Sequence, residues 1–159
     1  MDLLPIFQSI EDSGVGRAVR ESVWAFAVIE SIHLIALTMM GGAALLVDLR
    51  LLNLGLRQRP TAELAADASR FFNAGLIVLI ISGWGLFASE AVKCYYSSAF
   101  TVKIATLVVA TIFAYAFRNR VARAAEGHFS GGTRALVAIT SMALWFVVAA
   151  AGRWIGFSG

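Results

Sequence analysis

The stretch VWAFAVIESIHLIALTMMGGAALLV, residues 23–47, decides the fold class. It contains only two ionisable side chains, Glu30 and His33. A helix needs about 20 mostly apolar residues to cross the hydrocarbon core of a bilayer, and this stretch is long enough. Three further apolar stretches follow, at residues 71–88, 99–117 and 135–152. Their apolar runs are continuous, whereas the strands of a membrane barrel alternate in polarity. The sequence therefore predicts an all-α integral membrane protein with four spans.

The composition agrees with this prediction and excludes several other classes. Hydrophobic residues make up 59% of the 159 residues and charged residues only 14%, whereas a soluble domain has about 25% charged residues. The chain has one cysteine, so it is not a disulfide scaffold. Because the connections between spans are short, we expect a single domain over residues 1–159, an antiparallel four-helix bundle.

The arginines predict the orientation. They are concentrated in the connection after the first span and in the connection after the third, at Arg50, Arg57, Arg59, Arg70, Arg118, Arg120, Arg123 and Arg134. The positive-inside rule places both connections in the cytoplasm of a bacterial inner membrane and both termini in the periplasm. The net charge of +3 is explained by basic residues that set the orientation of the spans and contact anionic lipids. No nucleic-acid partner is expected.

The first 22 residues have a different character. Apolar residues come first and charged residues follow, which is typical of a short amphipathic helix on a membrane surface. A frayed terminus is the alternative. The residues concerned are Leu3, Leu4, Ile6, Phe7 and Ile10, then Glu11, Asp12, Arg17, Arg20 and Glu21.

Ionisable residues at membrane depth are costly and mark candidate functional sites. Glu30 and His33 are three residues apart, so they share a face of the first span with Met40. With the predicted topology, Lys103 in the third span and Arg153 at the end of the fourth lie in the same outer half. We therefore expect these residues to form a polar site in the outer half.

Several chemistries remain open for this site. His33 is a candidate axial ligand of haem b iron, with Met40 or Met142 as a second ligand. Alternatively, His33 handles a proton, while Lys103 and Arg153 hold a quinone headgroup or an anion. A metal site made by Glu30 and His33 is a further possibility.

The structural alternative for the same residues is a network that only fixes the register of the helices. In that case Glu30 pairs with Lys103 or Arg153, and His33 hydrogen-bonds a hydroxyl such as that of Thr106. At the inner end of the first span, Asp48 and Arg50 are expected to form a local ion pair.

Short pieces spread over the chain resemble a family of small bacterial four-helix membrane proteins of unknown function. The pieces are Glu30-Ser31-Ile32-His33, Asp48-Leu49-Arg50-Leu51-Leu52, Phe100-x-x-Lys103 and Gly152-Arg153. The resemblance implies a four-span bundle and brings no established activity. Its members often carry a histidine near the inner end of the third span, where this chain has Arg118. A more distant similarity connects the chain with copper-resistance and b-type cytochrome membrane bundles.

Together these features favour a redox-linked or accessory subunit of a membrane complex, with haem b or a quinone as its cofactor. One alternative is a small oligomeric transporter or channel that uses Glu30 and His33. Another is a purely structural subunit. The sequence contains no nucleophile elbow, phosphate loop, dinucleotide fingerprint or zinc signature, so an enzymatic activity is not favoured.

Overall fold

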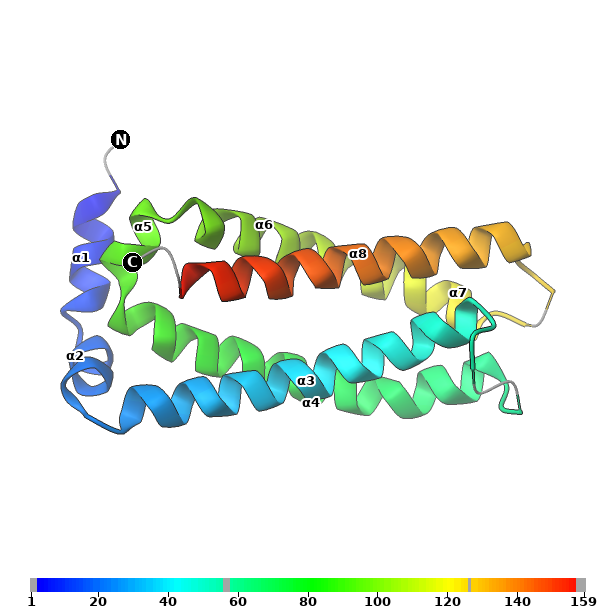
Figure 1. Ribbon diagram of the computed structural model, residues 1–159, viewed down its shortest axis with the longest axis horizontal. Helices are drawn as coiled ribbons and strands as arrows, with labels where there is room; N and C mark the ends of the chain where they lie inside the picture. Colours follow the sequence, from blue (N-terminus) through cyan, green and yellow to red (C-terminus); the bar gives the residue numbers. More distant parts are fainter. Residues whose placement is uncertain (1–2, 56–57, 126, 157–159) are drawn as a thin grey trace.

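Four long helical rods form the molecule (Figure 1). The computed structural model describes residues 3–55, 58–125 and 127–156, and this part contains no strand. Each rod is long and apolar enough to cross a membrane. The prediction of an all-α, multi-pass membrane protein is therefore confirmed. The rods are α3 (Ala25–Leu51), α4 (Thr61–Ser89), the continuous run of α6 (Ser98–Phe113), η1 (Ala114–Arg118) and α7 (Asn119–Arg123), and α8 (Gly131–Ile155).

The helices extend beyond most of the predicted spans. The largest extension is at α4, which begins at Thr61, well before the apolar span at 71–88. The sequence predicts this early start, because Pro60-Thr61 can begin a helix with Glu63 in its first turn. The first rod instead begins slightly later than expected, at Ala25. Hydropathy marks only the part of a helix that is apolar on all sides, and residues 61–70 mix alanines with charged side chains. Such a segment is a good helix former but leaves no continuous apolar run.

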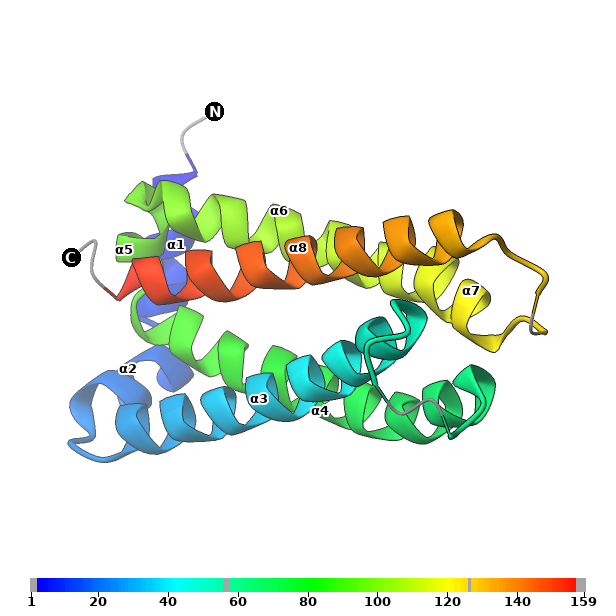
Figure 2. The same cartoon turned by 45° about the vertical axis from the view of Figure 1, so that its right-hand side comes forward.

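The rods run antiparallel as two helical hairpins. α3 packs along α4, the rod α6–η1–α7 packs along α8, and α8 also contacts α3. α3 and α4 cross each other, as Figures 1 and 2 show. The start of α3 and the end of α8 lie at one end of the bundle, here called the terminal end. The connections between α3 and α4 and between α7 and α8 lie at the other, here called the arginine-rich end.

The crossing of α3 and α4 depends on one glycine. A Cβ atom at Gly75 would lie 2.8 Å from the Cβ atom of Met40 and 3.0 Å from the carbonyl oxygen of Ala36. These distances are shorter than van der Waals contact, so no larger residue fits without moving the helices apart. Met40 and Ala36 are buried at this contact. Small residues permit such close approach between membrane helices.

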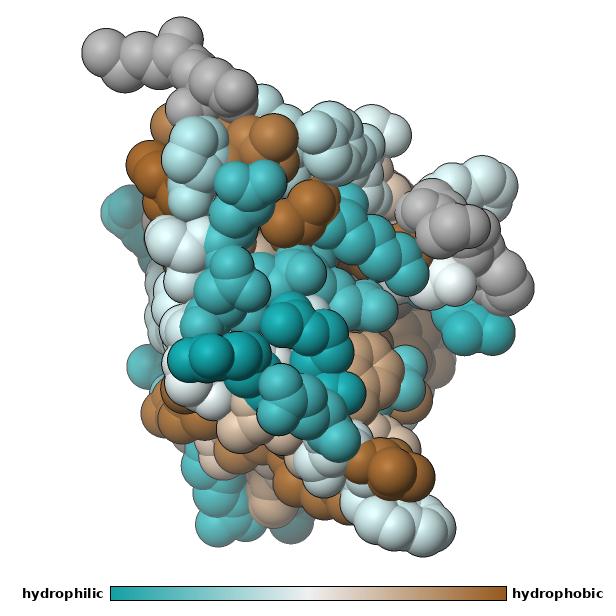
Figure 3. All heavy atoms as spheres, turned by 90° about the vertical axis from the view of Figure 1, so that its left-hand side faces the viewer, coloured by the Kyte–Doolittle hydropathy of each residue, from teal (hydrophilic) through white to brown (hydrophobic). Residues whose placement is uncertain are grey.

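The N-terminal segment is helical, and it packs on the bundle. It forms two short helices, α1 (Leu4–Glu11) and α2 (Gly14–Glu21), across the terminal end. The ring of Phe7 packs edge-on against Phe87 and Tyr95, and the Glu11 carboxylate accepts a hydrogen bond from the backbone N–H of Val92 at 2.7 Å. Val92 belongs to α5 (Ala91–Tyr96). Hydrophilic side chains gather over the middle of this end, with apolar side chains around them (Figure 3). An amphipathic helical segment is confirmed, with two helices instead of one, and the alternative of a frayed terminus is wrong.

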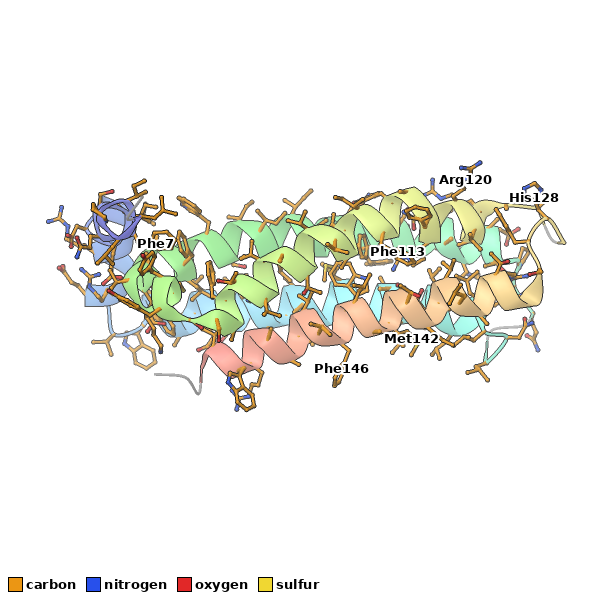
Figure 4. The ribbon with its side chains drawn as sticks, turned by 90° about the horizontal axis from the view of Figure 1, so that it is seen from above. Phe7, Phe113, Arg120, His128, Met142 and Phe146 are labelled. Atoms are coloured by element: carbon orange, nitrogen blue, oxygen red, sulfur yellow. The ribbon has the colours of Figure 1, made fainter. Side chains whose placement is uncertain are left out.

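Large apolar side chains cover the outside of the rods, as contact with a lipid bilayer requires. Ile81 on α4 and Phe146 on α8 are among those most exposed, and Figure 4 shows Phe146 pointing away from the bundle. An apolar groove between α3 and α8 is lined by residues such as Gly41, Ala44 and Met142. In a bilayer, lipid chains would occupy this groove and cover the apolar side chains around it.

Candidate functional site

His33 lies on the face of α3 that packs against α4. Its imidazole is buried, and the Nδ1 atom is 2.9 Å from the Oγ atom of Ser82. Gly83 makes room for the ring, because a Cβ atom there would lie 3.1 Å from the Cε1 atom of His33. The imidazole is therefore held in one position between the two helices of a hairpin.

The hydrogen bonds of Ser82 favour a proton on the Nδ1 atom of His33. A serine hydroxyl has one hydrogen to donate, and the Oγ atom of Ser82 lies 2.6 Å from the carbonyl oxygen of Val78, one helical turn earlier. With its hydrogen directed there, Oγ accepts from Nδ1–H of His33. The Nε2 atom of the neutral ring then carries the lone pair. No described residue donates a hydrogen bond to Nε2, while the backbone of Leu79 is a further hydrogen-bond partner of the His33 ring.

Lys103 approaches this site from the other hairpin. Its half-buried side chain lies across Gly152 of α8, and its Nζ atom is 3.4 Å from where a Cβ atom of Gly152 would be. Lys103 is close enough to His33 for their charges to interact. It forms no ion pair with a described acidic residue. The site therefore combines a basic nitrogen with an ammonium group whose charge has no counter-ion among the described residues.

The other expected members lie elsewhere. Glu30 is exposed on α3 and makes no ion pair with a described residue, so it is not joined to Lys103 or Arg153. Arg153 is exposed near the end of α8. Met40 is fully buried against α4 at the Gly75 crossing. Of the expected members, only Lys103 lies within range of a charge interaction with His33. Ser82 takes the place that the sequence suggested for Thr106.

Cys94 of α5 lies near Lys103, outside the spans. Burial raises the pKa of its thiol to about 11, and the nearby Glu90 carboxylate acts in the same direction. The thiolate is the form that binds metals, so Cys94 stays a protonated thiol at neutral pH. Among the described residues, no three His, Cys, Asp or Glu side chains are grouped to hold a metal ion.

His128 is the second histidine of the chain. It is exposed in the connection before α8, where its ring packs against Phe129. Figure 4 shows it at the arginine-rich end, far along the bundle from the terminal end where Phe7 lies. It therefore lies outside the bundle interior.

A second polar group lies nearer the arginine-rich end, and the sequence did not reveal it. Asp48 is buried in α3, and its Oδ2 atom accepts a hydrogen bond from Oγ of Ser141 in α8 at 2.7 Å. The expected ion pair between Asp48 and Arg50 is wrong. Arg50 instead donates to the carbonyl oxygen of Arg59 at 3.0 Å and to Oδ1 of Asn53 at 2.9 Å. Asp48 lies on the face of α3 that meets α8, so a partner from α8 reaches it.

Arg118 also differs from its expected position in a connection. It is the last residue of η1, a π-helical segment, and it is only 2% exposed. Its guanidinium group lies over the ring of Phe72, 4.8 Å from the ring centre. π-helical segments inside α-helices frequently occur at functional sites. An arginine at the end of an apolar run is normally a topology marker, so its sequence position gave no sign of burial.

The comparisons with known proteins identify the family without an activity. A model of a family of unknown function, DUF6644, matches residues 7–158. No curated protein and no solved structure matches the chain. The distant similarity to copper-resistance and b-type cytochrome bundles therefore stays a hypothesis. Because the match covers nearly the whole length, the chain belongs to the family of unknown function DUF6644.

Proposed function

We propose that this protein is a membrane subunit that binds a redox group, haem b or a quinone headgroup, at His33. The observation that carries the proposal is the hydrogen bond between His33 and Ser82, which leaves the lone pair of Nε2 available. Histidines that bind a metal almost always donate their other ring N–H to a fixed acceptor. A buried histidine with that arrangement is prepared for a ligand rather than merely packed.

Haem b and a quinone share the chemistry that these residues offer. The Nε2 lone pair of His33 would bind haem iron or accept a hydrogen bond from a hydroquinone hydroxyl. The ammonium group of Lys103 would hold a haem propionate or a quinone carbonyl. Either group, when bound, would supply electron transfer. The chain's own residues would position the group and provide the positive charge beside it.

Met40 does not suit the role of second haem ligand. It follows His33 by seven residues on the same helix, which places it about 10 Å farther along the axis. Its side chain is enclosed at the Gly75 crossing. If haem bound at His33, a second ligand would therefore come from another residue such as Met142, from water or from another subunit.

We further propose that the arginine-rich end faces the cytoplasm of a bacterial inner membrane and that both termini are periplasmic. Exposed arginines at that end support this orientation, among them Arg59, Arg70, Arg120 and Arg123. We propose that the protein works as a homo-oligomer or within a larger membrane complex, since a redox group must exchange electrons with a partner.

The packing favours this role over a channel that uses Glu30 and His33. Glu30 is exposed while His33 is buried. Beyond His33, the faces of α3 and α4 that meet are apolar, and they touch at Ala36, Met40 and Gly75. No polar path continues through that contact.

Absorption spectroscopy tests the proposal on protein purified in mild detergent from membranes. With haem b, we expect a reduced-minus-oxidised spectrum with haem bands that His33→Ala abolishes and Glu30→Gln leaves unchanged. With a quinone, we expect no such bands, and organic extraction should recover quinone from the wild type and little from His33→Ala. Folded wild-type protein that contains neither group, even after incubation with hemin or a short-chain quinone, would contradict the proposal.

A further inference from the structure

Asp48 and Arg118 carry opposite charges in the interior of the bundle, at the arginine-rich side of its centre. Their side chains are close enough for the charges to interact, yet they form no ion pair within 4.0 Å. Both residues are at most 2% exposed. They come from different hairpins, Asp48 from α3 and Arg118 from the rod that packs on α8.

Three polar atoms of this pair have no hydrogen-bond partner among the described residues. They are Oδ1 of Asp48 and the Nε and Nη1 atoms of Arg118. The known contacts of the pair use other atoms, since Ser141 donates to Oδ2 of Asp48 and Nη2 of Arg118 lies 3.4 Å from Oδ1 of Asn119. Buried polar atoms in proteins are almost always satisfied, if not by protein then by ordered water. One buried acceptor and two buried donors without protein partners are the kind of groups that an internal water satisfies.

We propose that Asp48 and Arg118 bind internal water, which bridges Oδ1 of Asp48 to the guanidinium group of Arg118. The site is independent of the redox site at His33. Asp48 and Ser141, which are hydrogen-bonded to each other, form one polar side of the site. Arg118 forms the other. The ring of Phe72 forms an apolar wall beside the guanidinium group and packs edge-on against Trp145. The bridge joins the two hairpins where α3, α8 and η1 meet.

The hydrated site ends at a dry layer. Between Asp48 and His33, the buried residues of α3 are apolar, and the opposing residues of α4 and α8 are apolar as well. This layer consists of Ala36, Met40, Ala44, Gly75, Leu79 and Val148. The protein therefore has two separate polar sites along α3, and water in one does not reach the other.

Hydroxyl-radical footprinting with short X-ray pulses tests this proposal on the full-length protein in lipid nanodiscs. Radicals formed from a trapped water oxidise the side chains beside it, even where bulk solvent has no access. Phe72 and Met40 are a matched pair, since they are 2% and 0% exposed. Methionine sulfur is oxidised readily. If burial alone decided the rate of oxidation, Phe72 would therefore not be oxidised faster than Met40.

We expect Phe72 to be oxidised several-fold faster than Met40 in the wild type. In Asp48→Leu/Arg118→Met, which removes the groups that bind the water, the rate at Phe72 should fall to that of Met40. Equally slow oxidation of Phe72 and Met40 in the wild type would overturn the proposal. This comparison uses only the wild-type protein, so it does not depend on the folding of a variant. Unchanged oxidation of Phe72 in the folded double variant would overturn it as well.

Discussion

Gly75→Leu is expected to destabilise the bundle by about 3 kcal/mol or more, a cost at the upper end of those for overpacked cores. The first added atom would already lie 2.8 Å from the Cβ atom of Met40 and 3.0 Å from backbone atoms of α3. Backbone atoms cannot turn aside as a flexible side chain can, so α3 and α4 must separate. The free energy of unfolding, measured by titration with SDS from mild detergent micelles, would report the loss.

Gly42→Leu is the matched control. Gly42 lies on the same hairpin and is exposed, and a Cβ atom there would meet nothing within 4 Å. The substitution also removes a helix-interior glycine, which favours the helix. We expect no loss of stability. Equal effects of the two substitutions would show that α3 and α4 do not touch at Gly75.

Arg118→Met is expected to destabilise the bundle, but by less than the ~3–5 kcal/mol that breaking a directly paired buried salt bridge costs, because Asp48 and Arg118 form no ion pair within 4.0 Å. It leaves the Asp48 carboxylate in the interior without a compensating cation. Asp48→Asn/Arg118→Met removes both charges and should therefore be more stable than Arg118→Met alone. Unfolding free energies of the single and double variants form a double-mutant cycle that isolates this coupling.

Arg120→Met provides the comparison for that cycle. Arg120 lies on the same rod as Arg118 but is exposed (Figure 4). Substitutions at exposed positions usually change stability by about 0.5 kcal/mol or less. If Arg118→Met were as mild as Arg120→Met, or if the effects at Asp48 and Arg118 simply added, the buried charge pair would not exist.

The sequence was sufficient to predict the fold because hydropathy depends on the solvent, here lipid, and not on tertiary contacts. Four long apolar runs separated by short connections leave little choice but an antiparallel bundle. Arg59 and Arg120 lie at one end of the bundle, as the distribution of arginines along the sequence predicts. The start of α4 at Thr61 lies outside any apolar run, and it is predictable from the helix-start residues Pro60-Thr61 rather than from hydropathy.

The candidate site was only partly predictable, because it depends on the rotation of each helix. His33 and Lys103 were identified from their polarity at membrane depth, but their partners depend on which faces meet. Ser82 becomes the partner of His33 through the crossing of α3 and α4. The partner of Asp48 and the burial of Arg118 were missed for the same reason. Each lies near the end of an apolar run, where a charged residue is usually exposed, and only the packed structure places it inside.

The central claim is that Ser82 holds the His33 ring so that Nε2 is free to bind a ligand. Nitrogen-15 NMR of histidine-labelled protein in lipid nanodiscs tests it most directly. The chain has two histidines, so His128→Gln leaves the signals of His33 alone. We predict a protonated, pyrrole-type shift for Nδ1 and an unprotonated, pyridine-type shift for Nε2, a preference that Ser82→Ala removes. A proton on Nε2 with a bare Nδ1 would contradict the account.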